Sequence, residues 1–174
     1  MLSFARHSPG PMTGGGRQIM QIKVRAAREQ DYDGVFPLLQ ELWPDRDLDK
    51  DVMHCVFKNS IAAENDFMFV AADGGRIVGF VAGDVSNNFY HEGLLCYIST
   101  LVVDADVRGK GIGTMLLRQV EALACDRNCA SVELDANFHR VASHAFYEHF
   151  GFAKRAYTFT LRIETIKEHL GRKE

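Results

Sequence analysis

The apolar residues follow two periods along the chain, and each period predicts one kind of element. An apolar residue at every second position predicts strands, which are expected over 22–26, 67–72, 76–85, 94–103, 132–136 and 157–163. Apolar residues three and four positions apart predict amphipathic helices over 31–42, 48–60, 112–126 and 141–150. The order of these segments indicates an α/β fold built around one sheet.

Local features refine this picture. The Asp-Gly-Gly turn at 73–75 lies between two apolar runs and predicts a hairpin. The strand at 94–103 ends in Leu-Val-Val, a continuous apolar run that indicates burial on both faces. Residues 1–19 are rich in Gly, Pro and Ser and show no period. They are predicted to be a disordered leader, outside a single domain at 20–174.

Composition and charge narrow the class of protein. With 174 residues, 47% of them hydrophobic, the chain is long enough for one domain with a substantial core. The formal net charge of −3 disfavours a nucleic-acid binder, which would carry a basic excess. No apolar run has the length of a membrane span or of a signal-peptide core, so no membrane partner is expected.

The cysteines are Cys55, Cys96, Cys125 and Cys129. They form no CxxC pair, and no His or Cys cluster has zinc spacing, so no metal is predicted. They are interpreted as free, mostly buried thiols in a reducing, cytoplasmic location. Cys96 could be an acyl-accepting nucleophile, but the sequence places no activating His beside it, which favours a structural thiol.

The most informative segment is 108–114, Arg-Gly-Lys-Gly-Ile-Gly-Thr, hereafter the glycine loop. Its three alternate glycines let a ligand approach the backbone without obstruction by Cβ atoms. The helix that begins here offers unpaired N–H groups and the positive end of its dipole to an anion. Arg108 adds a cation whose planar fork suits phosphate. The segment therefore favours a bound pyrophosphate.

Three other interpretations of the glycine loop compete. A Walker A loop has the pattern GxxxxGK[ST], whereas Lys110 lies inside the loop and no Ser or Thr follows it. A dinucleotide fingerprint has the pattern GxGxxG, which glycines 109, 111 and 113 do not match. A flexible turn between a strand and a helix is the remaining alternative.

Residues 101–113 resemble the acetyl-CoA signature R/Q-x-x-G-x-G/A of the GNAT superfamily of N-acetyltransferases. Residues 144–152 are similar to its second motif, in which Phe-Tyr is followed four residues later by Gly-Phe. The resemblance covers 21–163. It implies a central mixed, mostly antiparallel sheet, with a V-shaped splay between the fourth and fifth strands and about four flanking helices. Residues 140–147 are particularly similar to the aminoalkylphosphonate and aminoglycoside N-acetyltransferases.

The resemblance also implies how acetyl-CoA would be held. The pantetheine arm would run between the strands at 94–103 and 131–136, and an N–H there, assigned to Val102, would polarise the thioester carbonyl. Asn137 suits an amide-bearing arm, although an Asn that ends a strand or caps a helix fits it equally well. The implied cosubstrate residues are Leu101, Val102, Val103, Arg108, Gly109, Lys110, Gly111, Ile112, Gly113, Thr114, Asn137 and His144.

Tyr147 matches the general acid of the family. A CoA thiolate leaves more readily if a nearby hydroxyl protonates it. Arg140, His144 and Tyr147 share one face of the predicted helix, opposite the apolar residues 141, 142, 145 and 146. Without the motif, Tyr147 would be interpreted as a core tyrosine. His144 could bind the cosubstrate or orient Tyr147, and Arg140 could be a surface cation.

The acceptor must attack as a neutral amine, although an alkylammonium has a pKa near ~10. Many relatives place a Glu in the strand before the glycine loop, where this chain has Ser99 and Thr100. Glu92, Asp84 or His91 could instead remove the proton through water. For each of them an ordinary solvated loop residue is the simpler interpretation.

A small cationic amine is the expected acceptor, because acidic residues gather in the region where relatives bind it. These residues are Asp45, Asp47, Asp49 and Asp51 in one loop, with Asp84 and Glu92 opposite, next to His91; a solvated acidic turn is the alternative. The resemblance adds aminoalkylphosphonates and aminoglycoside-like amines. A protein or peptide amine, a non-catalytic acyl-CoA sensor and a nucleotide-binding protein are the other candidates. The sequence leaves both a monomer and a homodimer open.

Overall fold

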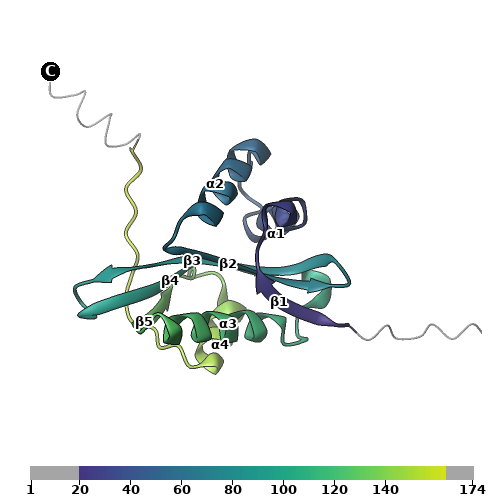
Figure 1. Cartoon of the computed structure of the whole chain (residues 1–174). Coiled ribbons are helices and arrows are strands. Elements are labelled where there is room, and N and C mark those ends of the chain that lie inside the picture. The colour runs from purple at the N-terminus through teal and green to yellow at the C-terminus, as the bar shows by residue number, and fades with distance from the viewer. Residues whose placement is uncertain (1–19, 164–174) are drawn as a thin grey trace, which may run out of the picture.

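The computed structural model describes residues 20–163, in which one sheet carries helices on both faces (Figure 1). The leader predicted at 1–19 lies outside the described residues. In chain order the elements are β1 (Ile22–Ala26), η1 (Glu29–Asp31), α1 (Tyr32–Leu42), α2 (Lys50–Ala62), β2 (Asp66–Asp73), β3 (Arg76–Asn88), β4 (Gly93–Val103), η2 (Ala105–Val107), α3 (Ile112–Asp126), β5 (Cys129–Leu134) and α4 (Val141–Phe150). The predicted helices and the first five predicted strands are confirmed, with small shifts at their ends.

The sheet has the order β1-β2-β3-β4-β5, with β4 and β5 parallel and the other neighbours antiparallel. The predicted hairpin joins β2 to β3, where Gly74 and Gly75 have φ of +55° and +99°. Only glycine adopts such angles without strain. The strand pairing confirms the mixed, mostly antiparallel sheet that the resemblance implied.

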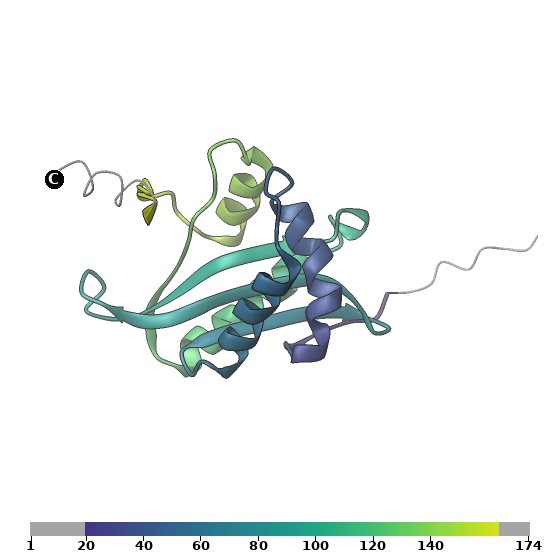
Figure 2. The same ribbon diagram turned by 90° about the horizontal axis from the view of Figure 1, so that it is seen from above.

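Strands β4 and β5 pair over only part of their length. Their ladder ends at the pair Ile98 and Leu134, and residues 99–103 of β4 continue beyond it. The two strands diverge from this point, as the view from above shows (Figure 2). This divergence is the V-shaped splay expected between the fourth and fifth strands.

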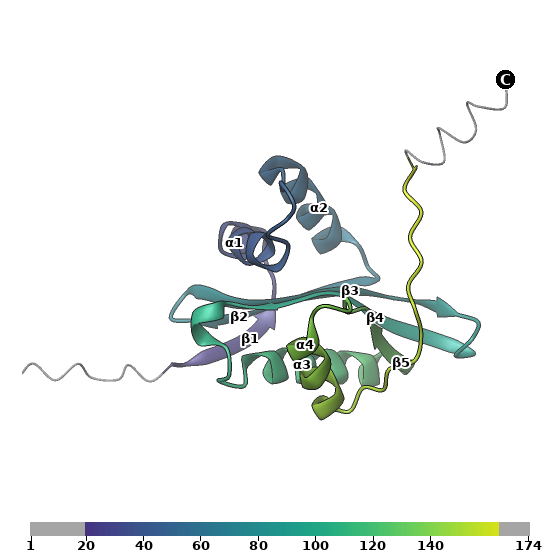
Figure 3. The ribbon, with the colours of Figure 1, turned by 180° about the vertical axis from the view of Figure 1, so that it is seen from behind.

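The helices form a layer on each side of the sheet. Helices α1 and α2 cover one face, and α3 and α4 lie on the other (Figures 1 and 3). Each layer encloses its own apolar cluster. The predicted burial of the end of β4 on both faces is confirmed, because Val102 packs in the cluster beneath α1 while Leu101 and Val103 pack against the cluster of α3.

The strand predicted at 157–163 does not form. Residues 152–162 have no regular secondary structure, and the side chains of Tyr157 and Phe159 are 74% and 94% exposed. Apolar and polar residues do alternate in this segment, but a strand also needs a neighbouring strand to satisfy its N–H and C=O groups. No described strand forms a ladder with this segment.

The predicted orientation of α4 was also wrong. Val141, Ala142 and Ala145 are exposed, whereas Phe146 and Tyr147 pack against the cluster of α3. The short helix turns its aromatic side chains inward because burying a ring removes more apolar area from water, and so stabilises the fold more, than burying an alanine. The expectation of mostly buried thiols fails as well, since Cys55 and Cys125 are exposed. None of the described helices is long and apolar enough to cross a membrane.

The start of α1 is fixed by one half-buried ion pair. Arg25 on β1 donates two hydrogen bonds to Asp31, at 2.6 and 2.7 Å, and the N–H of Arg28 donates a third at 2.7 Å. The carboxylate is only 6% exposed. Hydrogen bonding from Arg25, followed by that from the Arg28 N–H, lowers the pKa of Asp31 below its ordinary value. These contacts tie the first helix to the edge of the sheet.

Because the pKa of Asp31 is lower in the folded chain than in the unfolded chain, ionised Asp31 stabilises the fold above its unfolded pKa of about 3.9. We expect this contribution to be lost as pH falls below about 4. Asp31→Asn should lower the free energy of unfolding at pH 7 by roughly 2 kcal/mol and flatten its dependence on pH in the acidic range. Urea unfolding between pH 3 and pH 7 measures both effects. The exposed Asp33→Asn is the control, and equal losses for the two variants would contradict this account.

Candidate active site

The glycine loop forms an open N-terminus for α3. Gly109 and Gly111 have φ of +76° and +80°, and a Cβ atom added to either would meet no atom within 4 Å. No side chain of the described residues caps α3. The N–H groups of its first turn are therefore available to a ligand. Ile112, which is 1% exposed, fixes the helix start in the core.

The third glycine has a different role from the one predicted. A Cβ atom on Gly113 would lie 3.1 Å from the ring of Phe146. Gly113 therefore lets α4 pack closely against the start of α3, rather than opening the backbone to a ligand. This contact brings the second motif of the sequence next to the first.

The two cations of the glycine loop are differently placed. The guanidinium of Arg108 forms an ion pair with Glu41 near the end of α1, and its Nε donates to the carbonyl oxygen of Val103 at 2.9 Å. Two nitrogens of the guanidinium, Nε and Nη2, are thus engaged by the protein and hold the glycine loop against β4 and α1. The Nζ of Lys110 lies 3.4 Å from the sulfur of Met20 at the surface.

The divergence of β4 and β5 leaves one edge of β4 unpaired beside the glycine loop. Over residues 99–103, β4 hydrogen-bonds only to β3, so alternate N–H and C=O groups point toward the gap left by β5. This is the stretch in which the oxyanion role was predicted for Val102. On the far side of the gap, the carbonyl oxygen of Asn137 lies 3.0 Å from Nε2 of His144. His144 therefore holds the segment that follows β5.

Tyr147 lies on the inner side of α4, against the rings of Phe146 and Phe152. Burial raises the pKa of its phenol above the ordinary value, although the charge of Arg140 opposes this rise. The hydroxyl consequently keeps its proton at neutral pH. Arg140 itself donates to the carbonyl oxygen of Leu42, which ties the start of α4 to the end of α1. Arg140, His144 and Tyr147, which were predicted to share one face of α4, therefore make three separate contacts.

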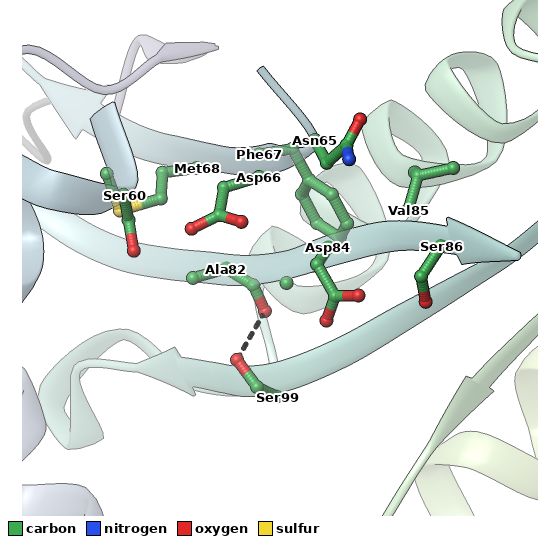
Figure 4. A pocket seen from close by; sticks show the side chains of 11 residues that line it. Ser60, Asn65, Asp66, Phe67, Met68, Ala82, Asp84, Val85, Ser86 and Ser99 are labelled. Carbon is green, nitrogen blue, oxygen red and sulfur yellow. Dashed lines mark hydrogen bonds between the residues drawn. The ribbon is translucent and has the colours of Figure 1, made fainter. Parts of the chain in front are cut away.

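A pocket of about 320 Å³ lies on the α1 and α2 face of the sheet, between the end of α2 and strands β2, β3 and β4 (Figure 4). Its polar lining includes Asp66 on β2, Asp84 on β3 and Ser99 on β4. Asp66 and Asp84 are cross-strand partners. Two like charges placed opposite each other repel, so a positively charged ligand would relieve this arrangement. We call this site the acceptor pocket, for the role that we propose for it.

A β-bulge shapes the acceptor pocket. Ala82 pairs with Thr100 and Gly83 pairs with Ile98, which leaves Ser99 as the extra residue on β4. The Oγ of Ser99 donates to the carbonyl oxygen of Ala82 at 3.2 Å. A Cβ atom on Gly83 would lie 1.9 Å from the carbonyl oxygen of Tyr97, so this close approach requires glycine. The bulge sets the pocket at the point where the splay begins.

The structure separates the candidate bases. Asp84 lines the acceptor pocket, whereas His91 lies 2.9 Å from Glu133 in a pair at the hairpin end of β4. Glu92 occupies the turn itself, with φ of 52°. In the acidic loop, Asp49 accepts hydrogen bonds from two N–H groups as the N-cap of α2. Of the candidates named from sequence, only Asp84 combines a carboxylate with a place at the pocket.

Two features of the site were not found from the sequence. Asp66 lies at the pocket because β2 pairs with β3 in the register that sets Asp66 opposite Asp84. Tyr97 donates to Asp135 at 2.7 Å, and burial together with this bond raises the pKa of Tyr97 to about 12. Both pairs depend on cross-strand register, which no local pattern in the sequence records. Among residues 20–163, no group of three His, Cys, Asp or Glu side chains is placed to hold a metal ion.

An open helix start, a splayed strand pair and a partly buried phenol beside them are the parts of a CoA-dependent acyltransferase. Comparison with known proteins agrees with this class. The family model described as the acetyltransferase (GNAT) family matches residues 23–152. The chain therefore belongs to the GNAT family of acetyltransferases, and acetyl-CoA is its cosubstrate.

The relatives are distant. An uncharacterized N-acetyltransferase of Methanocaldococcus jannaschii is 34% identical over 102 residues, which is 57% of this chain and 44% of that protein. N-alpha-acetyltransferase 30 of Schizosaccharomyces pombe is 29% identical over 120 residues, which is 67% of this chain and 78% of that protein. This chain thus spans less than half the length of the archaeal relative and about three quarters of the yeast one.

A solved structure of the aminoglycoside N-acetyltransferase AAC(6')-Iy, in complex with CoA, has a TM-score of 0.73 to this chain. The match covers 84% of this chain and 97% of the other at 15% identity, a likeness that concerns the fold alone.

The glycine loop can be tested with a matched pair of glycines. Gly111→Ala and Gly74→Ala both force a side chain onto a left-handed residue in open space, with φ of +80° and +55°. Each should cost about 1 kcal/mol of stability. Only Gly111→Ala should also weaken CoA binding, by roughly tenfold, because its Cβ would stand where the diphosphate approaches. Calorimetric titration with CoA measures this, and equal affinities for the two variants would remove the glycine loop from the binding site.

Proposed function

We propose that this acetyltransferase acts on a small primary amine of cationic character, which binds in the acceptor pocket. The observation that carries the proposal is the position of Asp66 and Asp84 beside Ser99, at the point where β4 and β5 separate. An amine held there would reach the gap from the α1 and α2 side. Tyr147 packs with the cluster on the α3 side, where a departing sulfur would be met by its phenol.

Binding of acetyl-CoA would use the backbone first. The diphosphate would accept hydrogen bonds from the N–H groups at the start of α3, assisted by the helix dipole. The pantetheine arm would follow the open edge of residues 101–103, with Asn137 and His144 on the opposite side. The N–H assigned to Val102 would then polarise the thioester carbonyl.

The reaction would proceed by direct attack. Asp84, directly or through one water molecule, takes a proton from the acceptor ammonium. The amine nitrogen attacks the thioester carbonyl carbon, a C–N bond forms, and the N–H of Val102 stabilises the oxyanion. The C–S bond then breaks, the sulfur keeps its electron pair, and Tyr147 donates a proton to the thiolate. The acylated nitrogen loses its second proton to solvent water, and the phenolate of Tyr147 takes up a proton from solvent, which restores the enzyme. The products are the N-acetylated amine and CoA.

The charges of the acceptor pocket discriminate between the expected acceptors. Carboxylates at Asp66 and Asp84 attract an amine that carries further positive charge, such as an aminoglycoside-like or polyamine-like acceptor. They disfavour an aminoalkylphosphonate, because its anionic group would meet like charge unless it were bound outside the pocket. A peptide amine is the second candidate, supported by the similarity to the yeast N-alpha-acetyltransferase.

The role of Tyr147 can be separated from binding. We expect Tyr147→Phe to lower kcat about 100-fold while the affinity for CoA stays unchanged, because only the proton donor is lost. A thiol-release assay over a panel of cationic amines and peptides, with calorimetry for CoA, measures the two quantities. Tyr157→Phe removes an exposed hydroxyl and is the matched control. Cofactor binding without turnover on any amine would favour an acyl-CoA sensor instead.

The acceptor pocket can be tested against the acidic loop. Asp84→Asn should reduce kcat/KM for cationic amines roughly 10- to 100-fold, by removing both the charge and the base. Asp66→Asn should mainly raise KM, because Asp66 attracts the acceptor without taking its proton. Asp45→Asn and Asp47→Asn remove charge from the exposed loop and are the controls. The proposal fails if the loop variants lose as much activity as Asp84→Asn.

A further inference from the structure

The ion pair between Glu41 and Arg108 joins the two helix layers beside the glycine loop. Glu41 lies in the last turn of α1, on one face of the sheet, and Arg108 leads into α3 on the other face (Figure 1). One carboxylate oxygen of Glu41 accepts a hydrogen bond from Nη2 of Arg108, and the other accepts one from the N–H of Ala105 at 3.4 Å. Glu41 thus contacts both ends of the turn that connects β4 to the glycine loop.

The position of Glu41 in its own helix does not favour a carboxylate. The last turn of an α-helix carries the negative end of the helix dipole, where an anionic side chain is destabilising. The last turn of α1 contains no basic residue that would offset this effect. The charge of Glu41 is therefore stabilised by its contacts with Arg108 and Ala105, and not by α1 itself.

The ion pair uses the part of Arg108 that a phosphate would use. A guanidinium holds a phosphate best with two parallel N–H groups, and both of its two-donor edges include Nη2. In Arg108, Nη2 is bound to Glu41 and Nε donates to the carbonyl oxygen of Val103, so that only Nη1 is left without a hydrogen bond within residues 20–163. A phosphate held by either edge would lie against the carboxylate of Glu41 and be repelled by it.

The side-chain charges around this turn cancel. They are those of two ion pairs, Glu41 with Arg108 and Asp104 with Arg76, together with Asp106 and Lys110. With no net charge from side chains, the attraction for an anion comes chiefly from the N–H groups at the start of α3. The loss of one carboxylate would make the side-chain charge around the turn positive.

We propose that Glu41 limits the affinity of the cosubstrate site, by keeping Arg108 from a two-donor contact with the diphosphate. The proposal rests on the binding of the diphosphate at the glycine loop. The diphosphate is remote from the thioester, so a tighter hold on it would stabilise the substrate and the transition state equally and would not speed the chemical step. It would only slow the departure of CoA. The ion pair thus lets CoA leave after each transfer.

Glu41→Gln tests this role, because the amide keeps the shape of the side chain and can still accept the N–H of Ala105, but loses the charge. We expect the affinity for CoA to rise about three- to tenfold at low salt, with KM for acetyl-CoA lowered by a similar factor and no gain in kcat. The rise should vanish near about 0.5 M NaCl, where exposed charges are screened. Calorimetry and initial rates measure these quantities. A variant that merely loosened the turn would bind CoA more weakly, and that result, or an unchanged affinity, overturns the proposal.

Two controls locate the effect at the diphosphate. S-acetylpantetheine lacks the diphosphate, so kcat/KM for this donor should be the same in Glu41→Gln and in the native chain. Glu121→Gln breaks an ion pair with Arg118 that is about as exposed and lies farther along α3, and it should leave the affinity for CoA unchanged. An equal gain with S-acetylpantetheine, or an equal gain in Glu121→Gln, contradicts the assigned role.

A double-mutant cycle tests whether Glu41 acts through Arg108. In a background of Arg108→Gln no guanidinium is freed, so Glu41→Gln should raise the affinity for CoA by at most about twofold. Equal gains in both backgrounds overturn the proposal. Failure of the binding site itself has a different signature, since Gly111→Ala would then bind CoA as the native chain does. A weakened Gly111→Ala beside an unchanged Glu41→Gln keeps the site and removes the role of Glu41.

Discussion

The site depends on one interruption of regular pairing, the bulge at Ser99. The missing Cβ of Gly83 lets β3 approach the carbonyl of Tyr97 closely, and Ser99 becomes an extra residue on β4. A bulge bends its strand and increases the local twist. The ladder between β4 and β5 ends at the preceding residue, Ile98. The gap between β4 and β5 and the pocket at Asp84 therefore both lie at this irregularity.

The rest of the fold holds the two sides of that gap at fixed positions. Phe146 packs on Gly113, so the helix that carries Tyr147 is set against the start of α3. Arg108 and Arg140 bind the end of α1 from the glycine loop and from α4 respectively. Both basic residues thus position the elements around the gap, and the start of α3 carries no side-chain cap among the described residues. This division agrees with the general use of helix N-termini for phosphate groups.

Much of the fold followed from sequence because its signals are local. Period, turn chemistry and capping depend on near neighbours, and they located the hairpin glycines, the helix over Ile112–Asp126 and the C-terminal glycine of α4. The failures have a common cause. The alternation at 157–163 describes a segment fit for a sheet, but whether a neighbouring strand is available is a property of the whole assembly. The inward face of α4 was likewise chosen by aromatic contacts with α3, not by its own periodicity.

The sequence by itself determined the elements, the glycine loop and the family motifs, because each is written in consecutive residues. Only the tertiary structure decided that Asp66 faces Asp84, that Tyr97 binds Asp135, and that Arg108 pairs with Glu41. The physical reason is that a charge acts over a few ångströms of space whatever the separation in sequence, and strand register together with the packing of helices on the sheet sets which charges come that close.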